Sequence, residues 1–220
     1  MDEVDINPYL PSRAEAPPVQ PLAAGSLKDP RVLGLWACWL LASSTMMELS
    51  LHAVEMFAPL ENLNDAESPV MWGYFLVALM MLACAIAAMV IYLIWKYRAA
   101  KNATLIDPLL MPVGPGMAVG SYFIPIVGFF VPYQAMKAIC QVSFGGTWLV
   151  GLWWMLYLAS WFFGIREISD DSDMFTRPDE IGHFTTALNL AYTIVAIRLV
   201  MRVTRSQSAL ARSTPPPMPG

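Results

Sequence analysis

The chain has 220 residues, of which 57% are hydrophobic and only 14% are charged, and its mean hydropathy is +0.51. This composition excludes an ordinary soluble domain and predicts an all-α integral membrane protein. The formal charge of −4 gives no sign of nucleic-acid binding. The three cysteines are an odd number and lie in apolar surroundings, where a thiol usually acts as a small hydrophobic group, so no disulfide is expected.

Both ends of the chain are predicted to be disordered. Residues 1–27 hold five prolines among small and polar residues, and such a segment buries too little surface to offset the entropy cost of ordering. The chain starts Met-Asp-Glu-Val-Asp without a basic region before an apolar core, so we expect no cleavable signal peptide. Residues 206–220 end in T-P-P-P-M-P-G and are expected to be extended. The membrane domain is therefore placed at residues 28–205.

Four apolar stretches of this domain are predicted to be transmembrane helices. The first begins at Val32, and a helix of about 20 residues is about 30 Å long, which matches a bilayer core. The second is the clearest, because its 26 residues contain no charged side chain. The four predicted spans are residues 32–57, 70–95, 147–165 and 181–203.

A fifth apolar segment, residues 117–136, is broken by Pro125, Gly128 and Pro132. The distribution of the 13 Lys and Arg residues indicates whether this segment crosses the membrane. If it does not cross, 11 of them are cytoplasmic and 2 are outside, whereas a crossing changes the split to 8 against 5. The positive-inside rule favours the first arrangement. We therefore predict four spans, two cytoplasmic termini and a re-entrant or interfacial broken segment.

The motifs around the broken segment resemble those of a known family. They are I-W-K-Y-R-A-A-K-N at residues 94–102, F-I-P-I at 123–126 and V-P-Y-Q-A-M at 131–136. With these motifs, the chain resembles the bacterial membrane proteins of the domain-of-unknown-function family 4328 over residues 32–205. The resemblance implies a multi-pass protein of the bacterial cytoplasmic (inner) membrane. It implies no activity.

The first candidate site joins the end of the second span to the broken segment. Trp95, Arg98 and Asn102 share one helical face, at i, i+3 and i+7, if the helix continues. Their guanidinium and amide groups are expected to bind backbone carbonyl groups that are freed near Pro125 and Pro132. Two other roles stay open: anchoring at the membrane interface, and a site for an anion or a lipid headgroup.

A second candidate site, for an ion or a proton, lies near the outer end of the spans. Glu48, His52 and Glu55 recur at i, i+4 and i+7 in the first span, and His183 lies at the same level in the fourth. Carboxylates and imidazoles bind transition metals or relay protons. The alternative is that these groups are solvated among lipid headgroups. We expect the alternative, because no metal-ligand spacing recurs, and we predict no metal and no other cofactor.

An enzyme is not expected, because the sequence has no Ser/His/Asp arrangement, phosphate-binding loop or paired-cysteine motif. The predicted role is a non-enzymatic scaffold or accessory subunit. Such a protein would act through contacts of its helices or tails with the bilayer, with a second copy or with another membrane protein. The alternative is a small oligomeric channel or transporter that uses the broken segment 117–136, because discontinuous helices line substrate sites in such proteins.

Overall fold

The computed structural model describes residues 27–57, 69–170 and 180–213, and the regular structure in these ranges is helical throughout. Four helices form a bundle: α1 (Arg31–Phe57), α2 (Pro69–Ile106), α5 (Trp148–Asp170) and α6 (Glu180–Ser213). Between α2 and α5 lie α3 (Pro115–Gly120), a 3₁₀ helix (Ser121–Phe123) and α4 (Val127–Phe144). The predicted all-α fold is confirmed.

Local sequence signals explain where several helices begin and end. Asp29 precedes α1, and its carboxylate accepts a hydrogen bond of 2.9 Å from the backbone N–H of Arg31, one of the first N–H groups of the helix, which have no partner within it. Pro69 begins α2 and Pro115 begins α3, positions at which a missing N–H costs little. α4 ends at Gly145, whose φ of 74° lies in the left-handed region that favours glycine.

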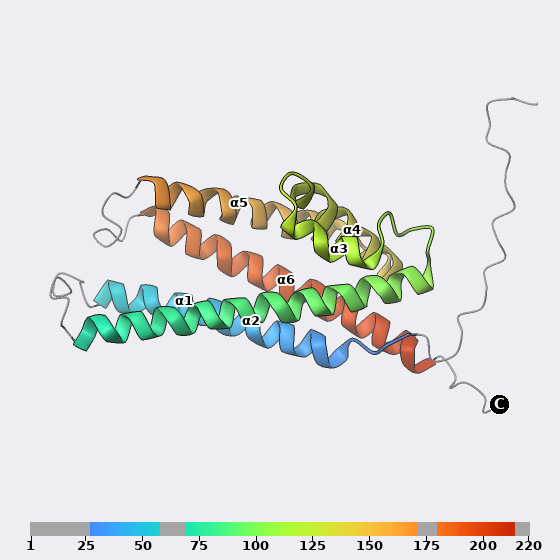
Figure 1. Ribbon diagram of the computed structural model, residues 1–220, viewed down its shortest axis with the longest axis horizontal. Helices are drawn as coiled ribbons and strands as arrows, with labels where there is room; N and C mark the ends of the chain where they lie inside the picture. Colours follow the sequence, from blue (N-terminus) through green and yellow to red (C-terminus); the bar gives the residue numbers. More distant parts are fainter. Residues whose placement is uncertain (1–26, 58–68, 171–179, 214–220) are drawn as a thin grey trace, which may run out of the picture.

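The four long helices form two antiparallel pairs along the long axis of the molecule (Figure 1). α1 packs against α2, α5 packs against α6, and contacts between α1 and α6 join the two pairs. α3 and α4 form a short helical hairpin, residues 115–144, which we call the hairpin. It enters and leaves at the end of the bundle where α2 ends and α5 begins (Figure 1), and it packs on α2, α5 and α6. We call this end the hairpin end.

The tip of the hairpin is an interruption of the helix inside the predicted broken segment. Ile126 has a φ of 62°, the one positive φ of a non-glycine residue in the described part of the chain, and such a backbone is strained. The carbonyl oxygen of Pro125 accepts a hydrogen bond from the N–H of Val127 within the tip. At Gly128 a Cβ would lie 3.1 Å from the carbonyl oxygen of Ser121, so glycine allows the two arms to approach.

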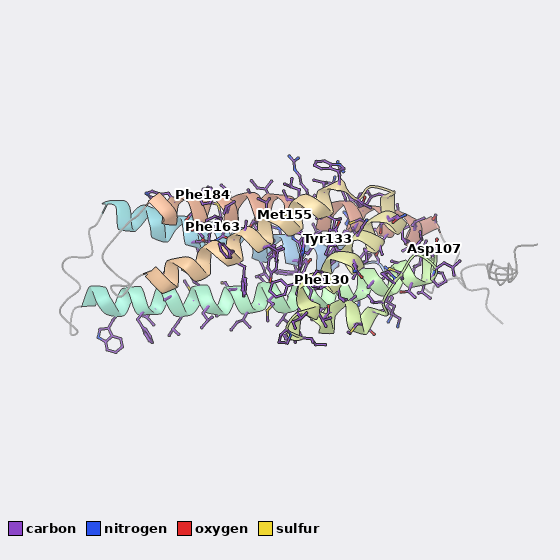
Figure 2. All side chains as sticks on the ribbon, turned by 90° about the horizontal axis from the view of Figure 1, so that it is seen from above. Asp107, Phe130, Tyr133, Met155, Phe163 and Phe184 are labelled. Atoms are coloured by element: carbon purple, nitrogen blue, oxygen red, sulfur yellow. The ribbon has the colours of Figure 1, made fainter. Side chains whose placement is uncertain are left out.

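The tip reaches toward the middle of the bundle and carries exposed apolar side chains. Figure 2 shows Phe130 well inside the length of the bundle, whereas Asp107 lies near the hairpin end. Phe123, Ile126 and Phe130 are 66%, 75% and 61% exposed. The hairpin therefore presents an apolar surface on its outer side.

The buried core lies mainly toward the hairpin end. Its largest fully buried apolar side chains come from four helices: Trp95 from α2, Met136 and Ile139 from α4, Trp153 from α5 and Leu199 from α6. These side chains belong to one hydrophobic cluster, so the hairpin is an integral part of the packed interior.

Three helices within the described residues are long and apolar enough to cross a membrane. Their candidate spans are Arg31–Ser50, Phe75–Ile106 and His183–Ser213. α5, which contains the third predicted span, has a shorter apolar stretch, Trp148–Phe163. The length and composition of the helices thus suit a membrane protein.

Two helices extend well beyond their predicted spans. α2 does not end at residue 95 but continues to Ile106, so the motif at residues 94–102 is helical. α6 continues to Ser213. The predicted disordered tail at residues 206–220 therefore starts too early, because Gln207 and Ser208 are buried in the bundle. Residues 1–26 and 214–220 lie outside the described part of the chain.

Candidate functional site

Lys96 in α2 is fully buried, which is rare for a lysine. Its ammonium group donates a hydrogen bond of 2.8 Å to the hydroxyl oxygen of Tyr122 and one of 3.1 Å to the backbone carbonyl oxygen of Pro132. Tyr122 belongs to the arm before the tip of the hairpin, and Pro132 lies inside α4, on the arm after it. Lys96 therefore binds both arms of the hairpin to α2.

Aromatic rings surround this cation. The Nζ atom lies 4.5 Å from the ring centroid of Tyr122 and 5.8 Å from that of Trp153, distances at which the electrons of a ring face attract a cation. No ion pair with a carboxylate is formed within the described residues. Because burial of an unpaired ammonium group is costly, the two hydrogen bonds and the rings must offset that cost.

The predicted contacts of Arg98 and Asn102 with the broken segment are wrong. Arg98 donates a hydrogen bond of 3.4 Å to the backbone carbonyl oxygen of Asp29, and Asn102 donates one of 2.8 Å to that of Lys28. Both acceptors precede α1, and neither belongs to residues 117–136. The donor that does reach the broken segment is the lysine at position 96.

Asn102 is part of a polar network that joins the helix ends at the hairpin end. Gln207 of α6 is buried, accepts a hydrogen bond of 3.1 Å from Asn102, and donates bonds of 3.1 Å to the carbonyl oxygen of Ala99 and the hydroxyl of Ser143. The backbone N–H of Lys28 donates to the side-chain oxygen of Asn102 at 3.2 Å. These hydrogen bonds hold four parts of the chain together: the segment before α1, α2, the end of α4 and the end of α6.

Trp95, the third residue of the predicted motif, ties α2 to α6. Its indole N–H donates a hydrogen bond of 3.0 Å to the hydroxyl oxygen of Thr204. Thr204 also meets α1 closely, since a Cβ added to Gly34 would lie 2.4 Å from its hydroxyl oxygen. Trp95, Arg98 and Asn102 do share a face of α2, as their spacing predicts, but the partners of this face are α6 and the start of α1.

A signal for the buried lysine was present in the sequence. Ala99, Ala100 and Ala103 follow Lys96 at i+3, i+4 and i+7, so the four residues share one helical face. Small residues on one face of a membrane helix indicate close packing, and all three alanines are fully buried. A lysine in line with them is therefore expected to point into the protein.

The predicted outer site is brought together only in part. The carboxylate of Glu48 accepts a hydrogen bond of 2.8 Å from the side-chain amide of Asn189, and α1 and α6 are neighbours, as a shared site requires. His183 is exposed on α6. The side chains of His52 and Glu55 lie outside the described residues, within which no cluster of three potential metal ligands occurs. The site stays a prediction.

The sequence matches a known protein family over most of the membrane domain. The match covers residues 65–205 and the family is described as a domain of unknown function, DUF4328. It includes Lys96 and the whole hairpin but leaves out α1, so it starts later than the resemblance over residues 32–205 predicted. Curated proteins and solved structures give no match. The matched region contains the buried lysine site. The chain therefore belongs to the DUF4328 family.

Proposed function

We propose that the protein is a four-span integral protein of the bacterial cytoplasmic membrane, with both termini in the cytoplasm and with the hairpin re-entering from the cytoplasmic side. Its role is that of a non-enzymatic scaffold or accessory subunit, which binds a second copy or another membrane protein through the surfaces of its helices. The observation that carries this proposal is the contrast between a hairpin that Lys96 fastens to the bundle and the exposed apolar surface of α2.

The positions of the helix ends support an even number of membrane crossings. Hydrogen bonds of Asn102 join the residues that precede α1 to the last part of α2 and to α6. The hairpin returns to this same end, where α5 begins (Figure 1). Exposed cations gather there, among them Lys101, Arg205 and Arg212, and the positive-inside rule assigns such an end to the cytoplasm.

The packing of the hairpin supports a structural role for the broken segment. Irregular backbone at membrane depth persists only where protein buries it or where it lines water. Here Lys96 binds both arms, and Met136 and Ile139 of α4 are fully buried against the long helices. The inner side of the hairpin is therefore used for folding, which leaves the outer surfaces of the bundle for binding.

Among the three candidate spans of the described residues, that of α2 is the least buried. Leu76 and Met80, which share a face at i and i+4, are 64% and 59% exposed, and Leu82, which points in another direction, is 57% exposed. Ala83 and Ala87, which are also exposed, are small residues one turn apart that allow close approach of another helix. A bilayer covers such a surface with lipid, and a partner helix fits the stretch with the alanines.

The second candidate function is a small oligomeric channel or transporter. The observation that favours it is the exposed apolar tip of the hairpin, where Phe123 and Ile126 are 66% and 75% exposed. If several copies met at these tips, strained backbone around Ile126 would lie beside a central path, as discontinuous helices do in transporters.

Cysteine labelling tests the topology. In a chain whose native cysteines are replaced by alanine, single cysteines at Asp65 and Asp171 should react with an impermeant maleimide from outside intact cells. Cysteines at Lys101 and Arg212, which are exposed at the hairpin end, should react only after permeabilisation. Labelling of Arg212→Cys in intact cells would contradict the four-span arrangement.

Site-specific photo-crosslinking tests the role. A photoreactive residue at Leu76 should give adducts of one defined protein mass in native membranes, whereas one at Leu199, which is fully buried, should give none. Adducts with lipid alone from Leu76, Met80 and Leu82 would refute the scaffold. An adduct of twice the chain mass through Phe123, with ion flux in reconstituted liposomes, would favour the channel.

A further inference from the structure

A groove of about 390 Å³ lies between the first turns of α1 and the last turns of α6. Three arginines line it: Arg31 from α1, and Arg205 and Arg212 from α6. Thr204 and Ser208, which are almost fully buried, also line it. The groove is thus built from two helices that are far apart in the sequence, and it is distinct from the lysine site beneath the hairpin.

The floor of the groove is fixed by hydrogen bonds and by close helix packing. Thr204 accepts the hydrogen bond of Trp95, and its close approach to α1 is possible because residue 34 is glycine. The hydroxyl of Ser208 donates a hydrogen bond to the carboxylate of Asp29. Both hydroxyls are therefore held in place, and the groove is part of the packed helix interface rather than a gap between mobile side chains.

The charge in the groove is positive. Arg31, Arg205 and Arg212 are exposed, and their guanidinium groups form no hydrogen bond or ion pair within the described residues. One carboxylate, that of Asp29, lies nearby. The pKa of Asp29 is lowered overall, although burial by itself raises it. The lowering comes from the hydrogen bonds of Ser208 and of the Arg31 N–H and from the charges of Arg212 and Arg31. Three cations thus face one anion, while the positive end of the α1 dipole and the negative end of the α6 dipole oppose each other here.

We propose that this groove binds a phosphate group, and that an anionic phospholipid headgroup supplies it. Guanidinium groups suit phosphate oxygens, which they bind in pairs of hydrogen bonds. A lipid fits better than free phosphate because Leu35 and Met201 continue the groove with apolar side chains, against which an acyl chain can lie. The inference depends on the groove alone and holds for either orientation in the membrane and for either proposed role.

Binding of defined lipids to the purified full-length protein in detergent tests the proposal. The probes are phosphatidylglycerol, phosphatidylcholine and inorganic phosphate, and the readouts are retained lipid by native mass spectrometry and the shift in unfolding temperature. Phosphatidylglycerol should bind and stabilise the parent, whereas phosphatidylcholine should not. If each arginine near an anionic lipid contributes about 1 kcal/mol, the double variant R205Q/R212Q should bind phosphatidylglycerol about 30-fold more weakly.

Two further variants make the result specific to the groove. K101Q/K137Q removes two exposed cations from α2 and α4, outside the groove, and should weaken binding less than threefold. R205K/R212K keeps the charge and should bind more tightly than R205Q/R212Q. Equal weakening in K101Q/K137Q and R205Q/R212Q would overturn the groove in favour of diffuse surface charge. Equal stabilisation by inorganic phosphate and by phosphatidylglycerol would overturn the lipid as the source.

Discussion

Replacement of Lys96 by methionine should loosen the hairpin without unfolding the bundle. Methionine keeps the length and most of the volume of the side chain but removes the hydrogen bonds to Tyr122 and Pro132. Each bond to a charged group contributes about 1.5–3 kcal/mol net, so their loss costs about 3–6 kcal/mol. Removal of a buried, unpaired ammonium group regains several kcal/mol of desolvation energy. We expect a net loss of about 1–2 kcal/mol in the stability of the hairpin.

Hydrogen exchange followed by mass spectrometry measures this effect region by region. Backbone amides of residues 115–135 should exchange about tenfold faster in Lys96→Met, whereas amides at the interface of α1 and α6 should not change. Lys96→Ala should lower the global stability by about a further 2–4 kcal/mol, because it also leaves a cavity. Lys101→Met, at an exposed position of the same helix, is the control. Unchanged exchange of residues 115–135 in Lys96→Met would refute the claim that this lysine fastens the hairpin.

Two further predictions concern the start of α1. Gly34→Ala should destabilise the protein by about 1–3 kcal/mol in thermal unfolding, because the new Cβ would collide with Thr204. Gly73→Ala is the control and should not destabilise it, because no atom lies within 4 Å of the added Cβ. Equal effects of the two substitutions would count against close packing of α1 on α6. The lowered pKa of Asp29 means that its carboxylate stabilises the folded protein above the ordinary value of 3.8, and that this contribution is lost as the pH falls through the folded-state pKa. Asp29→Asn should therefore make the unfolding temperature less sensitive to acid below about pH 4, and an identical pH profile would show that ionisation of Asp29 does not contribute to stability.

The presence of the long helices and the break between α3 and α4 could be predicted from the sequence. Charge-free stretches of about 20 residues must be helical to cross a bilayer, because a helix pairs all of its backbone groups internally and unpaired groups are not tolerated in lipid. Pro125 and Gly128 mark the interruption for local reasons too. Pro125 has no backbone N–H to donate, and Gly128 has no side chain, which allows another part of the backbone to approach closely. The ends of α2 and α6 could not be predicted in this way. Polar residues after positions 95 and 203 show where the chain leaves the membrane, but a helix can continue through them.

The direction in which the polar residues of α2 point could not be predicted in the same way. In a helix that is apolar on all sides, periodicity groups residues on a face but does not reveal which neighbour that face meets. Arg98 and Asn102 were therefore assigned to the broken segment, although residues 28–29 hold their partners. Lys96 is one of the 11 Lys and Arg residues predicted to be cytoplasmic, and charge counting does not distinguish a buried cation from one at the interface, because basic residues collect at the cytoplasmic end of any span.

The hydrogen bonds between α2 and α6 have a consequence for how the protein is made. Trp95 and Asn102 find their partners, Thr204 and Gln207, 109 and 105 positions later in the chain. At a synthesis rate of about 5–20 residues per second, about 5–20 s pass before those partners leave the ribosome. During this interval Asn102 can already bind Lys28, which precedes α1, whereas the indole N–H of Trp95 still lacks its partner in α6. The hydrogen bond between Trp95 and Thr204 therefore forms only after almost the whole chain has been synthesised.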